Sequence, residues 1–145
     1  MQPKINLYVL DTNTVTYLHR GNENLKWWIQ QVGSDRVATT IVTLYEQLRG
    51  RLALVNRKQS EASLIKAFEE LRSTHFYYCK VQVLQFDAAA AVEYRSLLQQ
   101  KIRIGVQDLR IAAIVLAHKA TLITSNPRDF QQIPDLQIAD WSQAH

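Results

Sequence analysis

The sequence predicts an α/β fold in which a mainly parallel sheet is flanked by helices. Short apolar runs alternate along the chain with longer segments whose apolar residues recur at helical spacing. Helical crossovers are the connections that join parallel strands, so this alternation favours a parallel sheet. With 145 residues, 47% of them hydrophobic and 21% charged, and no repeat or linker-like stretch, the chain is expected to form one domain over residues 1–145.

The elements follow one another in strand and helix order. The first strand is expected over residues 5–10, an apolar run that ends at Asp11, Thr12 and Asn13, which favour turns and helix N-caps. Further strands are expected over residues 36–41, 81–84, 121–124 and 136–138. Helices are expected over residues 14–19, 23–31, 43–54, 60–72, 87–100 and 106–118. Tyr77, Tyr78 and Cys79 are then expected to pack near a strand.

Composition excludes several classes of protein. The single cysteine, Cys79, cannot form a disulfide within one chain, and the four histidines have no zinc-binding spacing. The apolar run before Asp11 is too short for a signal peptide or a membrane span, so a cytoplasmic protein without membrane association is expected. A net charge of +4 and a pI near 9.3 suit a polyanionic partner without requiring one.

Acidic and amide side chains are expected to meet at one edge of the sheet. The candidates stand after strands or at helix starts: Asp11, Glu46, Asp108, Asn126 and Asp129. In parallel sheets the ligand site lies beyond the carboxyl ends of the strands, where all of these positions fall. Clustered carboxylates repel one another, and a bound cation removes that cost. Oxygen ligands without histidine select Mg²⁺ or Mn²⁺ rather than zinc.

Each acid also has a purely structural interpretation. Asp11 would serve as a helix N-cap, Asp108 would stabilise the first turn of its helix, and Asp129 would form a turn in a loop that contains proline. Glu46 would ordinarily be solvated, but its apolar neighbours predict a mostly buried helix, where a lone charge is unfavourable. The functional interpretation therefore depends on the convergence of these residues.

Four segments together resemble the PIN-domain nucleases, and in particular the VapC-type toxins of bacterial toxin–antitoxin pairs. They are residues 9–13 (VLDTN), 40–50 (TIVTLYEQLRG), 107–113 (QDLRIAA) and 122–130 (LITSNPRDF). The resemblance extends over nearly the whole chain and implies a PIN-like three-layer sandwich. It also implies a metal-dependent endoribonuclease with Mg²⁺ as cofactor, Mn²⁺ being the alternative, that forms a homodimer and is inhibited by a cognate antitoxin protein.

The resemblance assigns roles to particular residues. Asp11, Glu46 and Asp108 match the three principal acids of the family, and Asn126, ranked before Asp129, matches the fourth position. Thr12 and Thr124 match polar positions whose hydroxyls orient a carboxylate or a metal-bound water. The competing interpretation is a non-catalytic PIN-like module that binds RNA or protein, in which the acids serve as caps.

Basic and aromatic residues supply candidate contacts for partners. Arg110, which lies close to Asp108 in the sequence, is the first candidate for a phosphate contact with RNA substrate. The densest basic stretch follows Glu46 and consists of Arg49, Arg51, Arg57 and Lys58. One of the adjacent Trp27 and Trp28 is expected to contact another chain, the alternative being packing in the core of this one.

Overall fold

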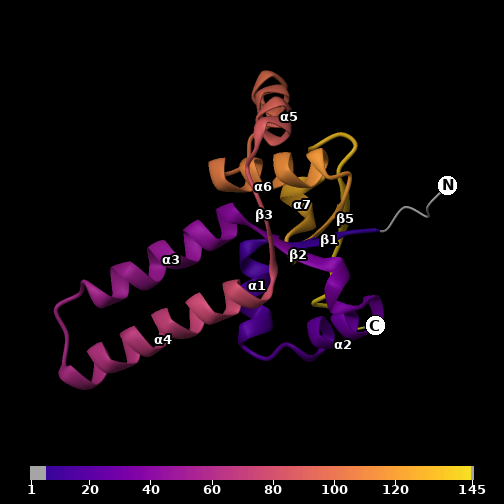
Figure 1. Ribbon diagram of the computed structural model, residues 1–145. Coiled ribbons are helices and arrows are strands. Elements are labelled where there is room, and N and C mark those ends of the chain that lie inside the picture. The colour runs from indigo at the N-terminus through magenta and orange to yellow at the C-terminus, as the bar shows by residue number, and fades with distance from the viewer. Residues whose placement is uncertain (1–5, 145) are drawn as a thin grey trace.

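A computed structural model describes residues 6–144 and shows helices on both faces of a parallel sheet (Figure 1). All pairings among the five strands are parallel, and the strand order is β3-β2-β1-β4-β5. The strands are β1 (Tyr8–Leu10), β2 (Val37–Thr40), β3 (Gln82–Leu84), β4 (Thr121–Ile123) and β5 (Gln137–Ala139). The predicted parallel α/β sandwich is thus confirmed, with β1 at its centre. The predicted start of the first strand at Ile5 lies outside the described residues.

All the helices that the structure describes were predicted in their order along the chain except the short α7. They are α1 (Thr12–His19), α2 (Glu23–Val32), α3 (Ile41–Val55), α4 (Glu61–Lys80), α5 (Ala88–Gln99), α6 (Val106–Ala117) and the short α7 (Pro127–Phe130). A 3₁₀ turn, Ser34–Arg36, precedes β2. Side chains of Asp11, Asn22, Thr40, Ser60 and Asp87 cap the helices that follow them, each by accepting a backbone N–H.

Alternation along the strands separates the two faces of the sheet. Val9 and Leu122 belong to a core with α5 and α6, whereas Leu10 and Ile123 belong to a second core with α1, α2 and Trp141. Successive strand residues point to opposite faces, so helices are required on both. This arrangement gives the three layers that were predicted.

Helices α3 and α4 lie side by side as a hairpin that projects from the sheet (Figure 1). The hairpin corrects two predictions. Helix α4 does not end near residue 72 but continues to Lys80, so Tyr77, Tyr78 and Cys79 belong to it. Tyr77 packs against the core that contains Leu10 of β1 and Ile123 of β4, near the strands as expected. Helix α3 is not mostly buried either, because Tyr45 is 51% exposed. One face of each long helix packs on its partner, and the other faces remain in solvent.

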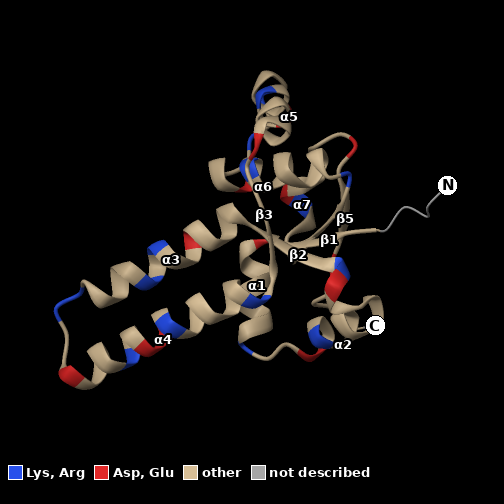
Figure 2. Ribbon diagram, in the orientation of Figure 1, with Lys and Arg blue, Asp and Glu red and all other residues tan. Residues whose placement is uncertain are grey.

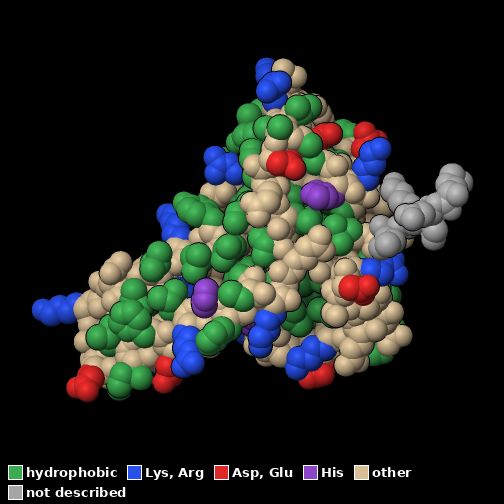
Figure 3. All heavy atoms as spheres, viewed as in Figure 1, with side chains coloured by type: hydrophobic (Ala, Val, Ile, Leu, Met, Phe, Trp, Pro, Cys, Tyr) green, Lys and Arg blue, Asp and Glu red, His purple; other side chains and the backbone are tan. Residues whose placement is uncertain are grey.

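The hairpin carries apolar side chains on its outer surface. Leu64, Ile65, Phe68 and Phe76 on α4 are exposed, and hydrophobic side chains gather over the hairpin in Figure 3. Basic and acidic positions are mixed along both helices (Figure 2). No helix among residues 6–144 is long and apolar enough to cross a membrane.

Tryptophan packing favours the alternative interpretation of the Trp27–Trp28 pair. Trp28 stacks on the buried Trp141 with ring centroids 5.7 Å apart and planes 11° apart, and it contributes to the second core. Trp27 is half-buried and meets the edge of Trp28 at 5.0 Å. At least Trp28 therefore serves the core of its own chain.

Candidate functional site

The carboxyl edge of the sheet collects the acids that the sequence singled out. Asp11 follows β1, Glu46 lies in the second turn of α3 after β2, and Asp129 lies in α7 after β4. Asp108 reaches the same region from the first turn of α6. Parallel strands end at one edge, and the helices that follow begin there, so residues far apart in sequence are brought together.

Electrostatics shows that these acids act on one another. The pKa of Asp108 is raised to about 6, mainly by burial and then by the negative charges of Asp11, Glu46 and Asp129. Three acids from three other segments of the chain therefore lie near enough to disfavour ionisation of the fourth. The four carboxylates therefore lie close enough to influence one another's ionisation.

Asp11 is held in place by the helix that it caps. Its side chain is 4% exposed, and its Oδ1 accepts the N–H of Thr14 at 2.9 Å. The Thr14 hydroxyl in turn donates to the carbonyl of Ile123 on β4 at 3.1 Å. The capping interpretation of Asp11 is thus correct, but it does not compete with the functional one, because the cap fixes the carboxylate at the edge of the sheet.

A chain of threonine hydroxyls fixes Glu46. Thr12 donates to Glu46 Oε1 at 2.6 Å, and the Thr12 and Thr43 hydroxyl oxygens are 3.1 Å apart. Each hydroxyl has one proton, so Thr43 must donate to Thr12, and Thr40 then donates to Thr43 at 3.4 Å. The three donations run in one direction and end on the carboxylate.

Thr40 and Thr43 were not predicted to belong to the site. Both are fully buried, and Thr43 precedes Glu46 by three residues on α3, a spacing that places two side chains on the same face of a helix. The spacing of Thr43 and Glu46 in the sequence could therefore have predicted that Thr43 lies beside the site. Thr12, by contrast, orients a carboxylate as the family resemblance implied.

The fourth position has a different geometry from the one predicted. Asn126 donates its side-chain amide to Asp129 Oδ2 at 2.8 Å, and the Asn126 backbone N–H donates to Thr124 Oγ1 at 3.0 Å. Asp129 acts on the pKa of Asp108, whereas Asn126 holds Asp129. This geometry favours Asp129 as the fourth acid, which reverses the ranking made from the sequence. Thr124 is fully buried and shapes this loop.

Arg110 lies beside another hollow. Its guanidinium donates to Gln107 Oε1 at 3.3 Å and lies 5.8 Å from the centre of the Tyr94 ring. Together with Tyr45 and Phe86 it lines a partly apolar cavity of about 420 Å³. These contacts direct the Arg110 guanidinium towards Tyr94 on α5.

A cation suits the chemistry of the four acids. All the candidate donors are carboxylate oxygens, which are the ligands that Mg²⁺ and Mn²⁺ prefer, and their mutual repulsion is the cost that a cation removes. Among residues 6–144, no three His, Cys, Asp or Glu side chains form a closed group that could hold a metal ion as they stand.

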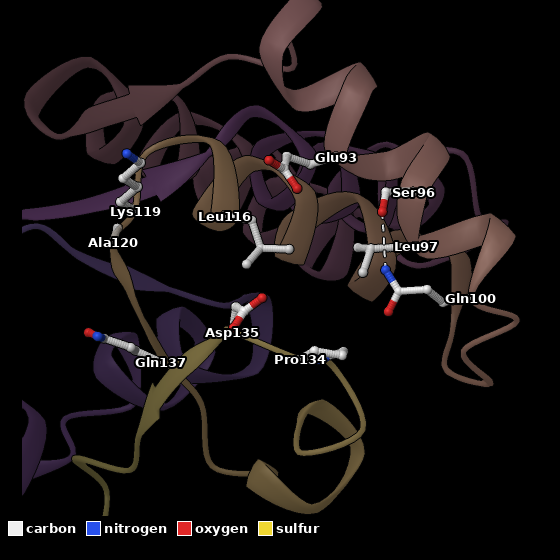
Figure 4. Close-up of a pocket in the computed structure, with 10 residues that line it drawn as sticks. All are labelled: Glu93, Ser96, Leu97, Gln100, Leu116, Lys119, Ala120, Pro134, Asp135 and Gln137. Atoms are coloured by element: carbon white, nitrogen blue, oxygen red, sulfur yellow. Dashed lines mark hydrogen bonds between the residues drawn. The ribbon is translucent and has the colours of Figure 1, made fainter.

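Another hollow lies at the opposite edge of the sheet. The pocket of Figure 4, of about 340 Å³, includes Ala120 just before β4 and Gln137 at the start of β5. Its lining mixes polar and apolar side chains, and it contains none of the four acids. The amino-terminal edge of the sheet thus offers space without the converging charges of the carboxyl edge.

Comparison with known proteins points to one family. The profile of the PIN domain matches residues 8–136. Ribonuclease VapC1 of Haemophilus influenzae strain R2866 is 32% identical over 142 residues, which cover 94% of this chain and 98% of that protein. The solved structure of VapBC-1 from nontypeable Haemophilus influenzae gives a TM-score of 0.74 at 29% identity, covering 94% of this chain and 99% of that one. DNA-bound VapBC from Salmonella typhimurium has the same fold, with a TM-score of 0.75 at 23% identity over 94% and 98% of the two chains.

Proposed function

This chain belongs to the PIN domain family, among the VapC ribonucleases of toxin–antitoxin systems, and we propose that Asp11, Glu46, Asp108 and Asp129 form the site at which it cleaves RNA. One observation carries the assignment: four acids from separate segments of the chain meet at the carboxyl edge of the sheet, where burial and then the charges of the other three raise the pKa of Asp108. A fold gains no stability from such crowding, so the cluster is best explained by the cation that it would bind.

The family is typically metal-dependent, and Mg²⁺ is the cation we assign to this site, with Mn²⁺ as the alternative. Asp11, Glu46, Asp108 and Asp129 would hold it, and Asn126 would position Asp129. When bound, the metal would lower the pKa of water, polarise the phosphoryl group and neutralise charge on the leaving oxygen of an RNA phosphodiester.

The residues of the chain divide the remaining work. Asp11 Oδ1 and Glu46 Oε1 are each committed to a donor within the protein, so the second oxygen of each carboxylate is the one that faces a ligand. The hydroxyl chain that ends at Thr12 keeps Glu46 in one orientation before substrate arrives. Asp108 retains a proton below about pH 6 and gives it up more readily as a cation approaches.

The first test is cleavage of a labelled RNA pool by the purified protein. We expect products with Mg²⁺, none with excess EDTA, and recovery when Mg²⁺ or Mn²⁺ is restored. Asp135→Asn supplies a matched control, since Asp135 is exposed and lies in the pocket at the opposite edge of the sheet. Cleavage that persists in EDTA at an unchanged rate would show that the acids are not a metal site.

A non-catalytic module that binds RNA or protein remains the second candidate, because Asp11 does cap α1. A module of this kind would bind RNA with the same affinity with and without Mg²⁺, and it would leave the labelled RNA pool uncleaved. The same assay therefore separates the two candidates, provided that binding is measured in parallel by fluorescence anisotropy.

The solved relatives named VapBC are toxin–antitoxin complexes, which supports an antitoxin as the partner of this chain. We propose that the chain forms a homodimer in the cytoplasm and is held inactive there by that antitoxin. Light scattering of the protein alone, and after co-expression with the product of the adjacent gene, tests both associations. A monomer at micromolar concentration would contradict the dimer.

A further inference from the structure

A trough leads away from Glu46, one of the four acids, along helices α1, α3 and α4. Its first part is a cavity of about 550 Å³ that begins at Thr12 and Glu46 and reaches Arg20 and Arg51. A second cavity of about 340 Å³ shares His19, Arg51 and Glu70 with the first and extends to Tyr77. Because the two cavities have three lining residues in common, they form one elongated depression that starts at the candidate active site.

Two arginines, Arg20 and Arg51, and two glutamates, Glu46 and Glu70, line the trough, and one of the arginines is fixed. Arg51 Nε donates to the hydroxyl of the buried Thr74 at 3.1 Å, and Arg51 Nη1 lies 3.5 Å from Glu70 Oε2. A guanidinium has five N–H donors, and the Arg51 side chain remains 33% exposed. A cation that is already ordered loses little further freedom when it binds an anion.

The second cation stands opposite on α1. Arg20 is exposed at the end of this helix, where its backbone N–H donates to the carbonyl of Thr16 at 3.1 Å. Its backbone is therefore fixed, while its long side chain can adjust to a ligand. Arg20 and Arg51 thus border the same cavity from two different helices.

The outer end of the trough presents aromatic rings. His19 meets Tyr77 edge to face, with ring centroids 4.2 Å apart and planes at 85°. Partial burial and the nearby Arg51 lower the pKa of His19, so it is a neutral ring at neutral pH. Rings next to a basic groove are the usual combination in proteins that bind single-stranded nucleic acid, where bases stack on the rings.

We propose that this trough holds the RNA strand on one side of the cleaved bond, with Arg20 and Arg51 on phosphates and the His19–Tyr77 pair against a base. The inference rests on the proposed function, because it takes the acids at the head of the trough as the cleavage site. An elongated depression with two arginines spaced along it suits successive phosphates of a linear polyanion better than a compact ligand. Contacts to phosphates position a strand without reading its sequence, so the trough sets affinity rather than base specificity.

Gly50 offers a way to obstruct the trough without removing a contact. It lies within α3 on the wall of the first cavity, and a Cβ built there meets nothing within 4 Å. Replacing a glycine inside a helix with a good helix former stabilises the helix, so Gly50→Glu and Gly50→Gln should both fold. The two side chains have nearly equal size, and only one of them repels phosphate.

The experiment compares Gly50→Glu, Gly50→Gln, Arg20→Gln and Arg51→Lys with the control Arg57→Gln, which removes an exposed cation near the tip of the same hairpin. KM and kcat are measured on a single-stranded RNA oligonucleotide, and binding is measured over a range of salt concentrations in an Asp11→Asn background. We expect Gly50→Glu and Arg20→Gln to raise KM at least fivefold with kcat nearly unchanged. Gly50→Gln and Arg51→Lys should have smaller effects. Loss of one phosphate contact should reduce the salt slope of binding by about 0.7.

The possible outcomes distinguish failure of the trough proposal from failure of the proposed function. If the wild-type protein cleaves RNA but all four trough variants match Arg57→Gln, the trough assignment is wrong and the site stands. If the variants weaken RNA binding but the wild-type protein never cleaves, the trough stands as a binding site and the proposed function fails. If the variants lose the antitoxin while the KM for RNA is unchanged, the trough is a protein-binding surface and our inference is overturned.

Discussion

The two halves of the candidate active site are held in different ways. On the side of β1 and β2, Asp11 and Glu46 each accept a hydrogen bond from a group fixed in a helix, and the threonine hydroxyls behind Glu46 are buried. On the side of α6 and α7, Asp108 is half-buried among negative charges, and Asp129 is held by the exposed amide of Asn126. Hydrogen bonds within the protein therefore hold the carboxylates of the first half in place, whereas those of the second half repel one another.

The difference indicates where a cation acts. A cation that binds between the halves gains little from ordering Asp11 and Glu46, which are already placed, and gains most from relieving Asp108. The half near β1 therefore defines where the metal would lie, while the half near α6 makes its binding favourable. Variants on the two sides should consequently differ in stability even where they are equal in activity.

The largest effect is expected from removing one acid on each side. Asp11→Asn and Asp108→Asn should each lower RNA cleavage in Mg²⁺ more than about 100-fold, because a metal supplies several kcal/mol of transition-state stabilisation. Without metal, Asp108→Asn should match or exceed the wild-type melting temperature, whereas Asp11→Asn should gain less, since its carboxylate also caps α1. An Asp108→Asn protein that cleaves at near wild-type rate would remove Asp108 from the site.

An intermediate effect is expected from the hydroxyl chain. Thr12→Val deletes the donor to Glu46 and should lower kcat by about 10-fold, within the range of about 10 to 100-fold usual for partners of metal ligands. Thr12→Ser keeps the hydroxyl and should recover most of the rate. If Thr12→Val and Thr12→Ser have the same kcat, the hydrogen bond has no role in catalysis. The two halves of the site would then not differ in how firmly they hold their carboxylates.

A smaller effect is expected at Asp129 and Asn126. Asp129→Ala should weaken Mg²⁺ affinity by about tenfold, because it removes one full charge from the site, and Asn126→Ala should weaken it less. Asn126→Asp should tighten Mg²⁺ binding but lower stability in EDTA, since it places a second carboxylate against Asp129. Calorimetric titration with Mg²⁺ measures all three, and a larger loss in Asn126→Ala than in Asp129→Ala would restore the original ranking.

The smallest effect concerns pH and stability. Asp108 has a folded pKa of about 6, above the value near 3.8 of an unfolded chain, so the folded state binds more protons between these limits. Stability in EDTA should therefore fall as pH rises from about 4 to 6, by roughly 1 kcal/mol once solvent screening of this half-exposed group is allowed for. Urea unfolding of Asp108→Asn should lack this component, and equal pH profiles for the two proteins would contradict it.

The sequence predicted the order of strands and helices because their periodic patterns are strong, and it predicted convergence because parallel strands share an edge. It did not predict α7, since four residues are too few to show a period, nor the full length of α4, whose last turns carry an irregular aromatic run. The threonine chain and the trough depend on contacts between segments about 20 residues apart in the sequence or more, such as Thr12 with Thr43 and His19 with Tyr77. No local pattern encodes such contacts.

The central position of β1 has a consequence for synthesis. This strand is made first, but its neighbour β4 emerges more than 100 residues later, and the N–H of Asp11 bonds to the carbonyl of Ile123. Such distant pairings form late in folding. A growing chain that has not reached β4 also lacks Asp129, which follows it, so the four acids cannot assemble before Asp129 has been made. We expect the nascent chain to be harmless to the ribosome and messenger RNA that produce it.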